Sequence, residues 1–199
     1  GVYSVLDYSV EGKVDEAQFD LALKKTLELI TFSKKNEAMP IAVFKPTGFG
    51  RLKIYQKVSD KSSLSPSEEE EWARIKKRFD LVCAYRKINN IKILIDSEES
   101  WIQEAVDDLI LEMMELYNKE AVIVYNTLQT YRWDRLEYLK KIHLKSHQLN
   151  FKLGFKIVRG AYMEKERLRA IEFGYKSPIC ETKALTDELF NDTLSFIFS

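Results

Sequence analysis

Polar side chains of chemically useful types follow a series of short apolar runs in this chain. In chain order they are Glu11, then Lys45, then Asp96, then Asn126 with Gln129, then Arg159 with Tyr162. The carboxyl ends of parallel strands meet at one rim in a barrel, so these side chains would face one cavity. Carboxylates, an ammonium, an amide and a phenol in one cavity could bind and orient a small charged substrate.

The elements that must position these residues can be read from the hydrophobic pattern. Strand-like runs occur at 41–44, 91–95, 121–125 and 155–158, and residues 4–9 are expected to form a first strand. Helical periodicity separates them at 14–33, 101–116 and 136–144. Strand and helix in alternation predict a parallel sheet. An open doubly wound sheet and an eight-stranded barrel both fit this pattern, and the polar strand ends favour the barrel.

The interval between the second and third runs is too long for a simple loop. Residues 65–68 read Ser-Pro-Ser-Glu, a capping box with proline at the first helical position. We therefore expect a helical insertion at about 50–88 within one domain covering 1–199.

Composition excludes several classes of protein. Lys plus Arg and Asp plus Glu both total 31, so no net field favours nucleic acid. Cys83 and Cys180 form no metal-binding spacing, and His143 and His147 lack a third ligand nearby, so no metal site is expected. The apolar runs are too short to cross a bilayer. A cytoplasmic location is expected.

Five segments together resemble the proline dehydrogenase family, in the order in which that family carries them. They are DYSVE at 7–11, VFK at 43–45, IDSEES at 95–100, NTLQTY at 126–131 and KIVRGAYM at 156–163. The resemblance implies a (β/α)8 TIM-like barrel, of which this chain covers about the first five strand–helix units. It also implies oxidation of L-proline to Δ1-pyrroline-5-carboxylate, with hydride transfer to FAD and electrons passed on to a quinone.

Catalytic and substrate-binding roles follow from the resemblance alone. Lys45 matches a lysine that binds the carboxylate of proline, and Asp96 an aspartate beside that lysine. Glu11 matches an acidic residue that pairs with an arginine over the substrate. Tyr162 matches a tyrosine that lines the pocket.

Cofactor-binding roles follow in the same way. Gln129 matches an amide that hydrogen-bonds the flavin. Bacterial members often have arginine at the position of Lys156. The lysine found here resembles the mitochondrial-type branch of the family. The backbone of Val158, Arg159 and Gly160 is expected to lie along the flavin, with glycine allowing close approach and the cations near developing negative charge.

One departure and two alternatives stand beside this interpretation. The family's final helix carries an Arg-Arg pair, which does not occur in these 199 residues, so we expect a truncated and inactive barrel. The alternatives are another barrel enzyme, such as a Schiff-base aldolase using Lys45, and a noncatalytic α/β interaction module. The resemblance also suggests a homo-oligomer, peripheral contact with the inner membrane, and a mitochondrial location in a eukaryote.

Overall fold

The computed structural model describes residues 5–7, 14–89 and 91–199. In this part of the chain one parallel five-stranded sheet runs in the order β1-β2-β3-β4-β5. The strands are β1 (Leu6–Asp7), β2 (Ile41–Phe44), β3 (Lys92–Ile95), β4 (Val124–Gln129) and β5 (Phe155–Val158). An order that follows the chain, with helices between strands, is the arrangement of a (β/α) barrel.

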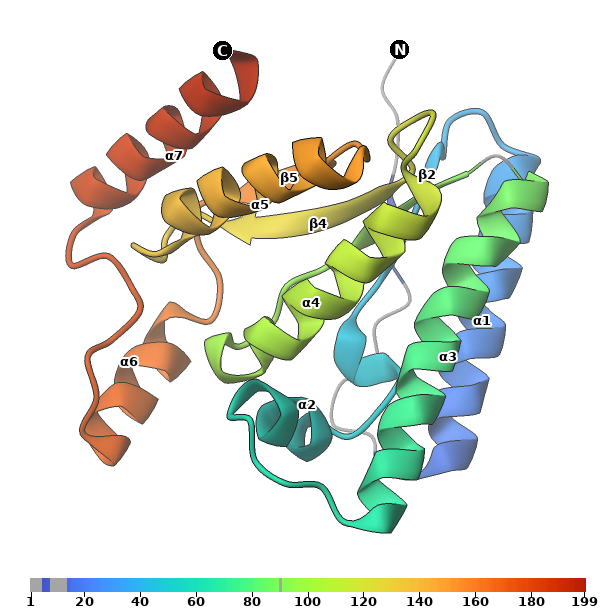
Figure 1. Ribbon diagram of the computed structural model, residues 1–199, viewed down its shortest axis with the longest axis horizontal. Coiled ribbons are helices and arrows are strands. Elements are labelled where there is room, and N and C mark those ends of the chain that lie inside the picture. Colours follow the sequence, from blue (N-terminus) through green and yellow to red (C-terminus); the bar gives the residue numbers. More distant parts are fainter. Residues whose placement is uncertain (1–4, 8–13, 90) are drawn as a thin grey trace.

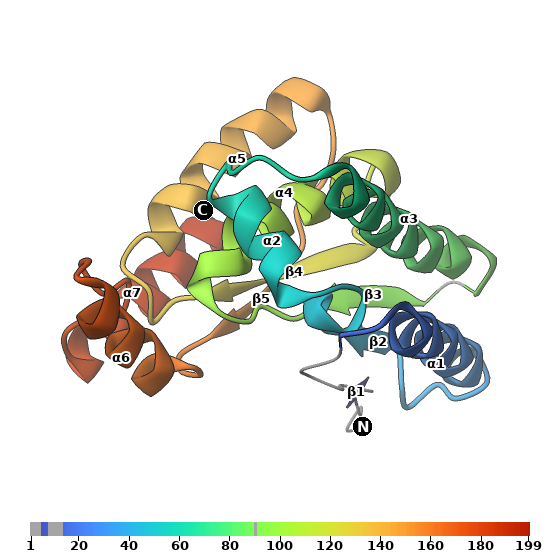
Figure 2. The same cartoon turned by 90° about the horizontal axis from the view of Figure 1, so that it is seen from below.

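Helices follow and flank the strands in the described part of the chain. They are α1 (Glu16–Lys34), α2 (Leu52–Ser59), α3 (Pro66–Asn89), α4 (Ser100–Tyr117), α5 (Arg135–Leu149), α6 (Met163–Phe173) and α7 (Lys183–Phe198), with a 3-10 turn η1 at Pro46–Gly48. Figures 1 and 2 show α1, α3, α4 and α5 in an arc around the curved sheet. None of the helices in the described ranges has both the length and the hydrophobicity to cross a membrane.

Local capping explains where several helices begin. The predicted capping box is confirmed: Ser65 N donates to Glu68 Oε2 at 2.8 Å, and Glu68 N donates to Ser65 Oγ at 3.4 Å. Asp15 accepts from the Gln18 amide at 2.9 Å before α1. Helices α2 and α3 occupy the region predicted to be a helical insertion.

Side-chain alternation divides the sheet into two faces. Alternate residues of β2, β3 and β4 are buried in the core shared with the helices: Ala42, Phe44, Ile93, Ile95, Val124 and Leu128. Because successive side chains point to opposite faces, Val43, Leu94 and Thr127 face the other side. The same alternation puts the residues that follow them by two, Lys45, Asp96 and Gln129, on that second face, which is the interior of the arc.

The fourth strand lies three residues later than predicted. The apolar run suggested 121–125, whereas β4 begins at Val124 and continues through the polar Gln129. The Asn118 side chain accepts from the amides of Ile123 and Val124, at 3.0 and 2.9 Å, which ties the segment before the strand to the end of α4. The polar residues extend the strand because each finds a buried partner.

Asn126 shows that the prediction of a shared rim for all the polar strand ends was wrong at one position. Its side chain points into the helical layer and donates to Asp107 Oδ1 at 2.8 Å. The same carboxylate accepts from Gln103 at 2.8 Å and from Arg135 at 2.7 Å. Asp107 and Arg135 are both buried, so this network joins β4, α4 and α5 through a desolvated ion pair.

The first strand and its acidic residue can be compared with the prediction only in part. Leu6 pairs with Ala42 and Asp7 with Val43, as expected for a first strand beside β2. Glu11 lies outside the described residues.

Replacing Arg135 by Met should lower the free energy of unfolding of the full-length protein by about 3–5 kcal/mol, because Asp107 would keep its charge in a buried site without its cation. Equilibrium urea unfolding measures this loss. The matched control is Lys140→Met on the same helix, whose pair with Glu137 is exposed and should contribute less than about 1 kcal/mol. Equal losses in the two variants would show that the buried pair stabilises the folded state no more than the exposed pair does.

Candidate active site at the strand ends

Three of the residues predicted from the sequence, Lys45, Asp96 and Gln129, lie at the carboxyl ends of β2, β3 and β4 on the interior face, and Lys156 lies on the same face within β5. Lys45 directly follows Phe44, which pairs with Ile95 in the neighbouring strand. Asp96 follows Ile95, and its amide donates to the Phe44 carbonyl at 3.0 Å. Lys45 and Asp96 therefore stand side by side along the rim, at the ends of neighbouring strands.

Asp96 forms an ion pair with Lys156, which the sequence did not predict. Its carboxylate accepts from Lys156 Nζ, which reaches it from two strands away. Thr127, the register partner of Lys156 on the strand between them, donates to the same carboxylate at 3.3 Å. A small side chain at position 127 leaves the space that this pair occupies. Asp96 thus holds the lysine predicted to face the flavin.

Glu98, within the IDSEES segment, is a buried carboxylate whose role the sequence did not predict. It is 2% exposed and accepts from Thr47 twice, from the amide at 2.9 Å and from the hydroxyl at 2.6 Å. Burial raises its pKa to about 7 from 4.5, the Thr47 bonds oppose the shift, and Glu99 adds to it while Lys45 opposes it. Glu98 therefore anchors the turn that follows Lys45 to the end of β3.

Gln129 lies in the same buried network. Its amide nitrogen donates to the Glu98 carbonyl at 2.5 Å, and its amide oxygen accepts from Arg132 at 3.4 Å. An amide has two N–H donors and two acceptor lone pairs, so these contacts leave capacity for a further planar partner. The side chain is 2% exposed, and its orientation is set before any ligand binds.

The end of β5 divides its residues between two environments. The Val158 carbonyl accepts from the amide and the hydroxyl of Thr130, both at 2.9 Å. The Arg159 guanidinium instead contacts α7, at 3.3 Å from Asp187 Oδ1 and 4.6 Å from the centroid of the Phe190 ring. The assignment of the Arg159 side chain to the cofactor stays a prediction, and in this structure it ties the strand end to α7.

Tyr162 ends the same segment in an unusual conformation. It precedes the first residue of α6 with φ 51° and ψ 3°, in the left-handed region that a tyrosine seldom occupies. The ring is half-buried. A shallow hollow of about 390 Å³ is lined by residues 161–165 around it.

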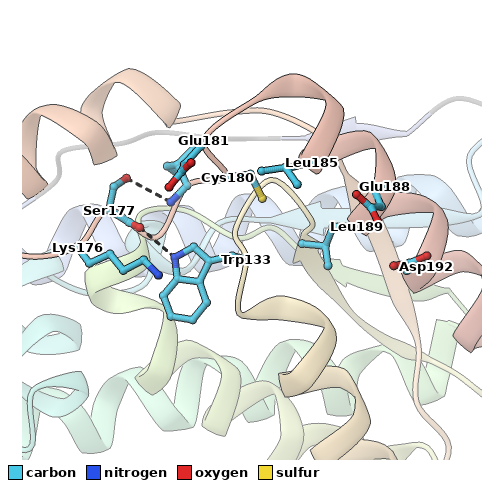
Figure 3. Close-up of a pocket in the computed structure, with 10 residues that line it drawn as sticks. Trp133, Lys176, Ser177, Cys180, Glu181, Leu185, Glu188, Leu189 and Asp192 are labelled. Carbon is cyan, nitrogen blue, oxygen red and sulfur yellow. Dashed lines mark hydrogen bonds between the residues drawn. The ribbon is translucent and has the colours of Figure 1, made fainter.

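A second hollow lies apart from these residues (Figure 3). It measures about 550 Å³ and is formed by Trp133, the 176–181 segment and the start of α7. The Trp133 indole donates to the Ser177 carbonyl at 3.0 Å, and Lys176 Nζ lies 4.7 Å from the centroid of the Trp133 rings. Its lining contains none of the residues that the sequence assigned to chemistry, so the strand-end cluster remains the candidate active site.

Comparison with known proteins identifies the family. The family model described as proline dehydrogenase matches residues 1–199. The chain belongs to the proline dehydrogenase family. The prediction from the five quoted segments is confirmed.

Relatives of known name agree with this assignment. The carbapenem antibiotics biosynthesis protein CarD of Pectobacterium carotovorum is 36% identical over 99% of this chain and 51% of its own length. Mitochondrial proline dehydrogenase 2 of Arabidopsis thaliana is 34% identical over 88% of this chain and 38% of its own length. The chain thus spans about half of one relative and less of the other.

Solved structures confirm the predicted fold class. Proline utilization A of Bdellovibrio bacteriovorus superposes with a TM-score of 0.83, at 18% identity, over 98% of this chain and 21% of that protein. The homologue from Corynebacterium freiburgense gives 0.80 at 18% identity, over 99% of this chain and 20% of its own. The chain has the fold of about the first five strand–helix units of an α/β barrel of the proline dehydrogenase type.

The strand-end residues fit a flavin by their chemistry. At Gly160 an added Cβ would meet only Met163 Sδ, at an ordinary 3.6 Å, and the backbone is not in the left-handed region. Among the described residues nothing requires glycine there, whereas a closely approaching ligand would. The Gln129 amide and the Lys156 ammonium add the hydrogen-bond donors and the positive charge that a polar ring edge needs.

Replacing Glu98 by Gln should flatten the dependence of stability on pH. Because the native pKa is raised to about 7, the folded state binds more protons than the unfolded state between pH 4.5 and about 7, and the free energy of unfolding falls as pH rises through that window. The full effect is roughly 3 kcal/mol. Glutamine can keep both contacts with Thr47 but does not titrate.

Urea unfolding at a series of pH values from 5 to 8 measures this difference. Glu112→Gln, which removes an exposed carboxylate from α4, controls for the loss of one negative charge. A variant at Glu98 that follows the wild-type curve would show that the buried carboxyl is not the titrating group.

Proposed function

We propose that the protein carrying this chain oxidises L-proline to Δ1-pyrroline-5-carboxylate, with FAD as the hydride acceptor and a quinone as the final electron acceptor. The observation that carries the proposal is the placement of Lys45, Asp96 and Gln129 at adjacent strand ends, with Lys156 on the same face within β5, in a chain matched throughout by the proline dehydrogenase family.

The substrate side of the site is assigned to Lys45 and Tyr162. Oxidation removes a hydride from the ring carbon next to nitrogen and a proton from that nitrogen, so the ring must be held in one orientation. The Lys45 ammonium binds the carboxylate of proline, a charge-assisted contact that fixes one end of the substrate. Tyr162 lines the pocket and excludes water, and Glu11 is proposed to pair with an arginine over the substrate.

The cofactor side is assigned to the ends of β4 and β5. When bound, FAD supplies the two-electron acceptor that no side chain provides. Gln129 would hold the polar edge of the ring system, and Lys156 would stand near it with its position set by Asp96. The backbone from Val158 to Gly160 would lie along the ring.

The role of Asp96 follows from its partner. The Lys156 ammonium, on its flexible stem, loses rotamer freedom when it is held in one position. The Asp96 carboxylate holds it in that position before ligands bind. Asp96 also adjoins Lys45 along the rim. One carboxylate can therefore influence both the lysine assigned to the substrate, Lys45, and the lysine assigned to the cofactor, Lys156.

Two further roles belong to the proposal. The quinone partner and peripheral contact with an inner membrane would couple the reaction to electron transport, and the relative from Arabidopsis thaliana is mitochondrial. A homo-oligomer is proposed on the resemblance alone.

CarD motivates a second candidate role. Its identity of 36% extends over nearly the whole chain, and its name places it in carbapenem biosynthesis. The same oxidation could then serve a biosynthetic route. Turnover of ring-substituted prolines compared with L-proline separates the two roles, because a catabolic enzyme should favour the unsubstituted ring.

The Schiff-base alternative makes an opposite demand on Lys45. An aldolase would form a covalent adduct there with a carbonyl substrate, which borohydride would trap. Absence of trapping, together with proline-dependent dye reduction by the full-length protein, is the result expected here.

Asp96→Ala in the full-length protein should lower proline turnover by about 100-fold or more, because Lys156 would lose the group that positions it. Dye reduction measures turnover, and circular dichroism checks that the fold is kept. Near-normal turnover would remove Asp96 from the site.

Lys45→Ala and Gln129→Ala should separate substrate binding from cofactor binding. Loss of a charge-assisted contact of about 1.5–3 kcal/mol should raise the KM for proline roughly 10- to 150-fold in Lys45→Ala, with FAD content unchanged. Gln129→Ala should instead lower FAD content, read from flavin absorbance. Lys53→Ala, at an exposed position of α2, is the control. The reverse pattern would show that the two roles are exchanged.

A further inference from the structure

Helix α6 is fastened to the start of α4, a segment more than 60 residues earlier in the chain (Figure 1). The fastening involves three neighbouring residues of α4 and its preceding turn: Glu99, Ser100 and Trp101. Helix α6 directly follows Tyr162, so these contacts lie beside the candidate active site without belonging to the groups already assigned to it.

Glu166 is the centre of this fastening. Its carboxylate accepts from the Ser100 amide at 2.5 Å and from the Ser100 hydroxyl at 2.6 Å. Ser100 is the first residue of α4, and Glu99 before it provides no side-chain cap. Glu166 is 1% exposed, so its charge is desolvated and is stabilised by these donors and by the positive end of the α4 dipole.

Two lateral contacts fix the direction of α6. Lys165 forms an ion pair with Glu99, and its Nζ lies 5.5 Å from the centroid of the Trp101 rings. Arg169, one turn further along α6, stacks on the same indole at 4.4 Å. The helix is therefore held at Glu166 and, one turn apart on one face, by two cations that both contact Trp101.

The backbone before α6 shows what this fastening maintains. The Glu166 amide donates to the Tyr162 carbonyl at 2.9 Å, the first hydrogen bond of the helix. Tyr162 itself has φ 51°, which is unfavourable for a residue with a Cβ and persists only where surrounding contacts determine it. Tyr162 makes no side-chain cap to its own helix. The first turn of α6 begins at this residue, so the contacts of Glu166 hold the backbone on its carboxyl side.

We propose that Glu166 is a positioning residue that acts through Tyr162: by capping α4 it fixes the first turn of α6 and holds Tyr162 in its left-handed conformation at the edge of the substrate pocket. The step to catalysis rests on the proposed function, in which Tyr162 lines the pocket for proline. The step from Glu166 to the backbone of Tyr162 does not.

Amide hydrogen exchange of the full-length protein tests the structural step. In Glu166→Ala, exchange at the amides of residues 100, 102 and 166 should be about tenfold faster, because these amides make the hydrogen bonds of the two helix starts that Glu166 holds together. Glu166→Gln should exchange at close to the wild-type rate, since its oxygen can accept from the Ser100 amide and its nitrogen can donate to the hydroxyl. Glu172→Ala, which removes an exposed carboxylate near the other end of α6, should leave both segments unchanged.

A double-mutant cycle in proline kinetics tests the step to Tyr162. Glu166→Ala should raise the KM for proline about fivefold with FAD content unchanged, and Glu166→Gln should restore most of the wild-type value. In a Tyr162→Ala background the Glu166→Ala substitution should change KM by less than twofold, because the side chain that it positions is already gone.

The outcomes separate the two ideas. Unchanged exchange in Glu166→Ala overturns the positioning role whatever the activity. Faster exchange together with additive effects in the kinetic cycle overturns the action through Tyr162. If the wild-type protein reduces no dye with proline, the proposed function fails, while the exchange result still decides whether Glu166 holds the start of α6. Should Glu166→Ala not fold, Lys165→Ala takes its place: loss of the ion pair with Glu99 should also speed exchange at the two helix starts, and unchanged exchange would overturn the positioning of α6 by α4.

Discussion

The register between neighbouring parallel strands decides which side chains share the rim. Phe44 pairs with Ile95, and Thr127 pairs with Lys156, so Lys45, Asp96 and Lys156 emerge on one face. A slip by one residue in any strand would send its polar side chain into the helical layer, where Asn126 already lies. The apolar contacts of Phe44 and Ile95 with the helices resist such a slip, so core packing specifies the site.

A buried polar layer lies directly behind this rim. Glu98 binds Thr47, Gln129 binds the Glu98 carbonyl, and the backbone of Lys45 lies two residues before Thr47. In a desolvated setting each of these bonds is difficult to replace, because an unpaired partner would keep its full desolvation penalty. The predicted substrate residue and the predicted cofactor residue are thereby parts of one rigid unit. This rigidity suits a reaction that requires two reactants at a fixed distance.

Sequence patterns predicted the strands whose residues are apolar and missed what depends on three-dimensional neighbours. The runs at 41–44 and 155–158 match β2 and β5, because a buried strand must be apolar on its helical face. β4 was displaced since its polar residues look like a loop until Asp107 and Glu98 are seen beside them. The Asp96–Lys156 pair depends on the sheet's curvature, and Glu98 could have been suspected only from an acidic residue two positions beyond a predicted rim residue.

The sheet order also has a consequence for how the chain assembles. Each strand from β2 to β5 pairs with the one that precedes it in the sequence, so these four strands can form their first edge without waiting for a later one. During synthesis from the amino terminus, a new strand and its helix can add to an edge already in place, with the closure of only a modest loop each time. The anchoring of α6 on α4 also links segments more than 60 residues apart, as the pair of Arg78 with Glu16 does. The contact of α6 with α4 would form late, so the backbone of Tyr162 would be among the last parts to reach its final conformation.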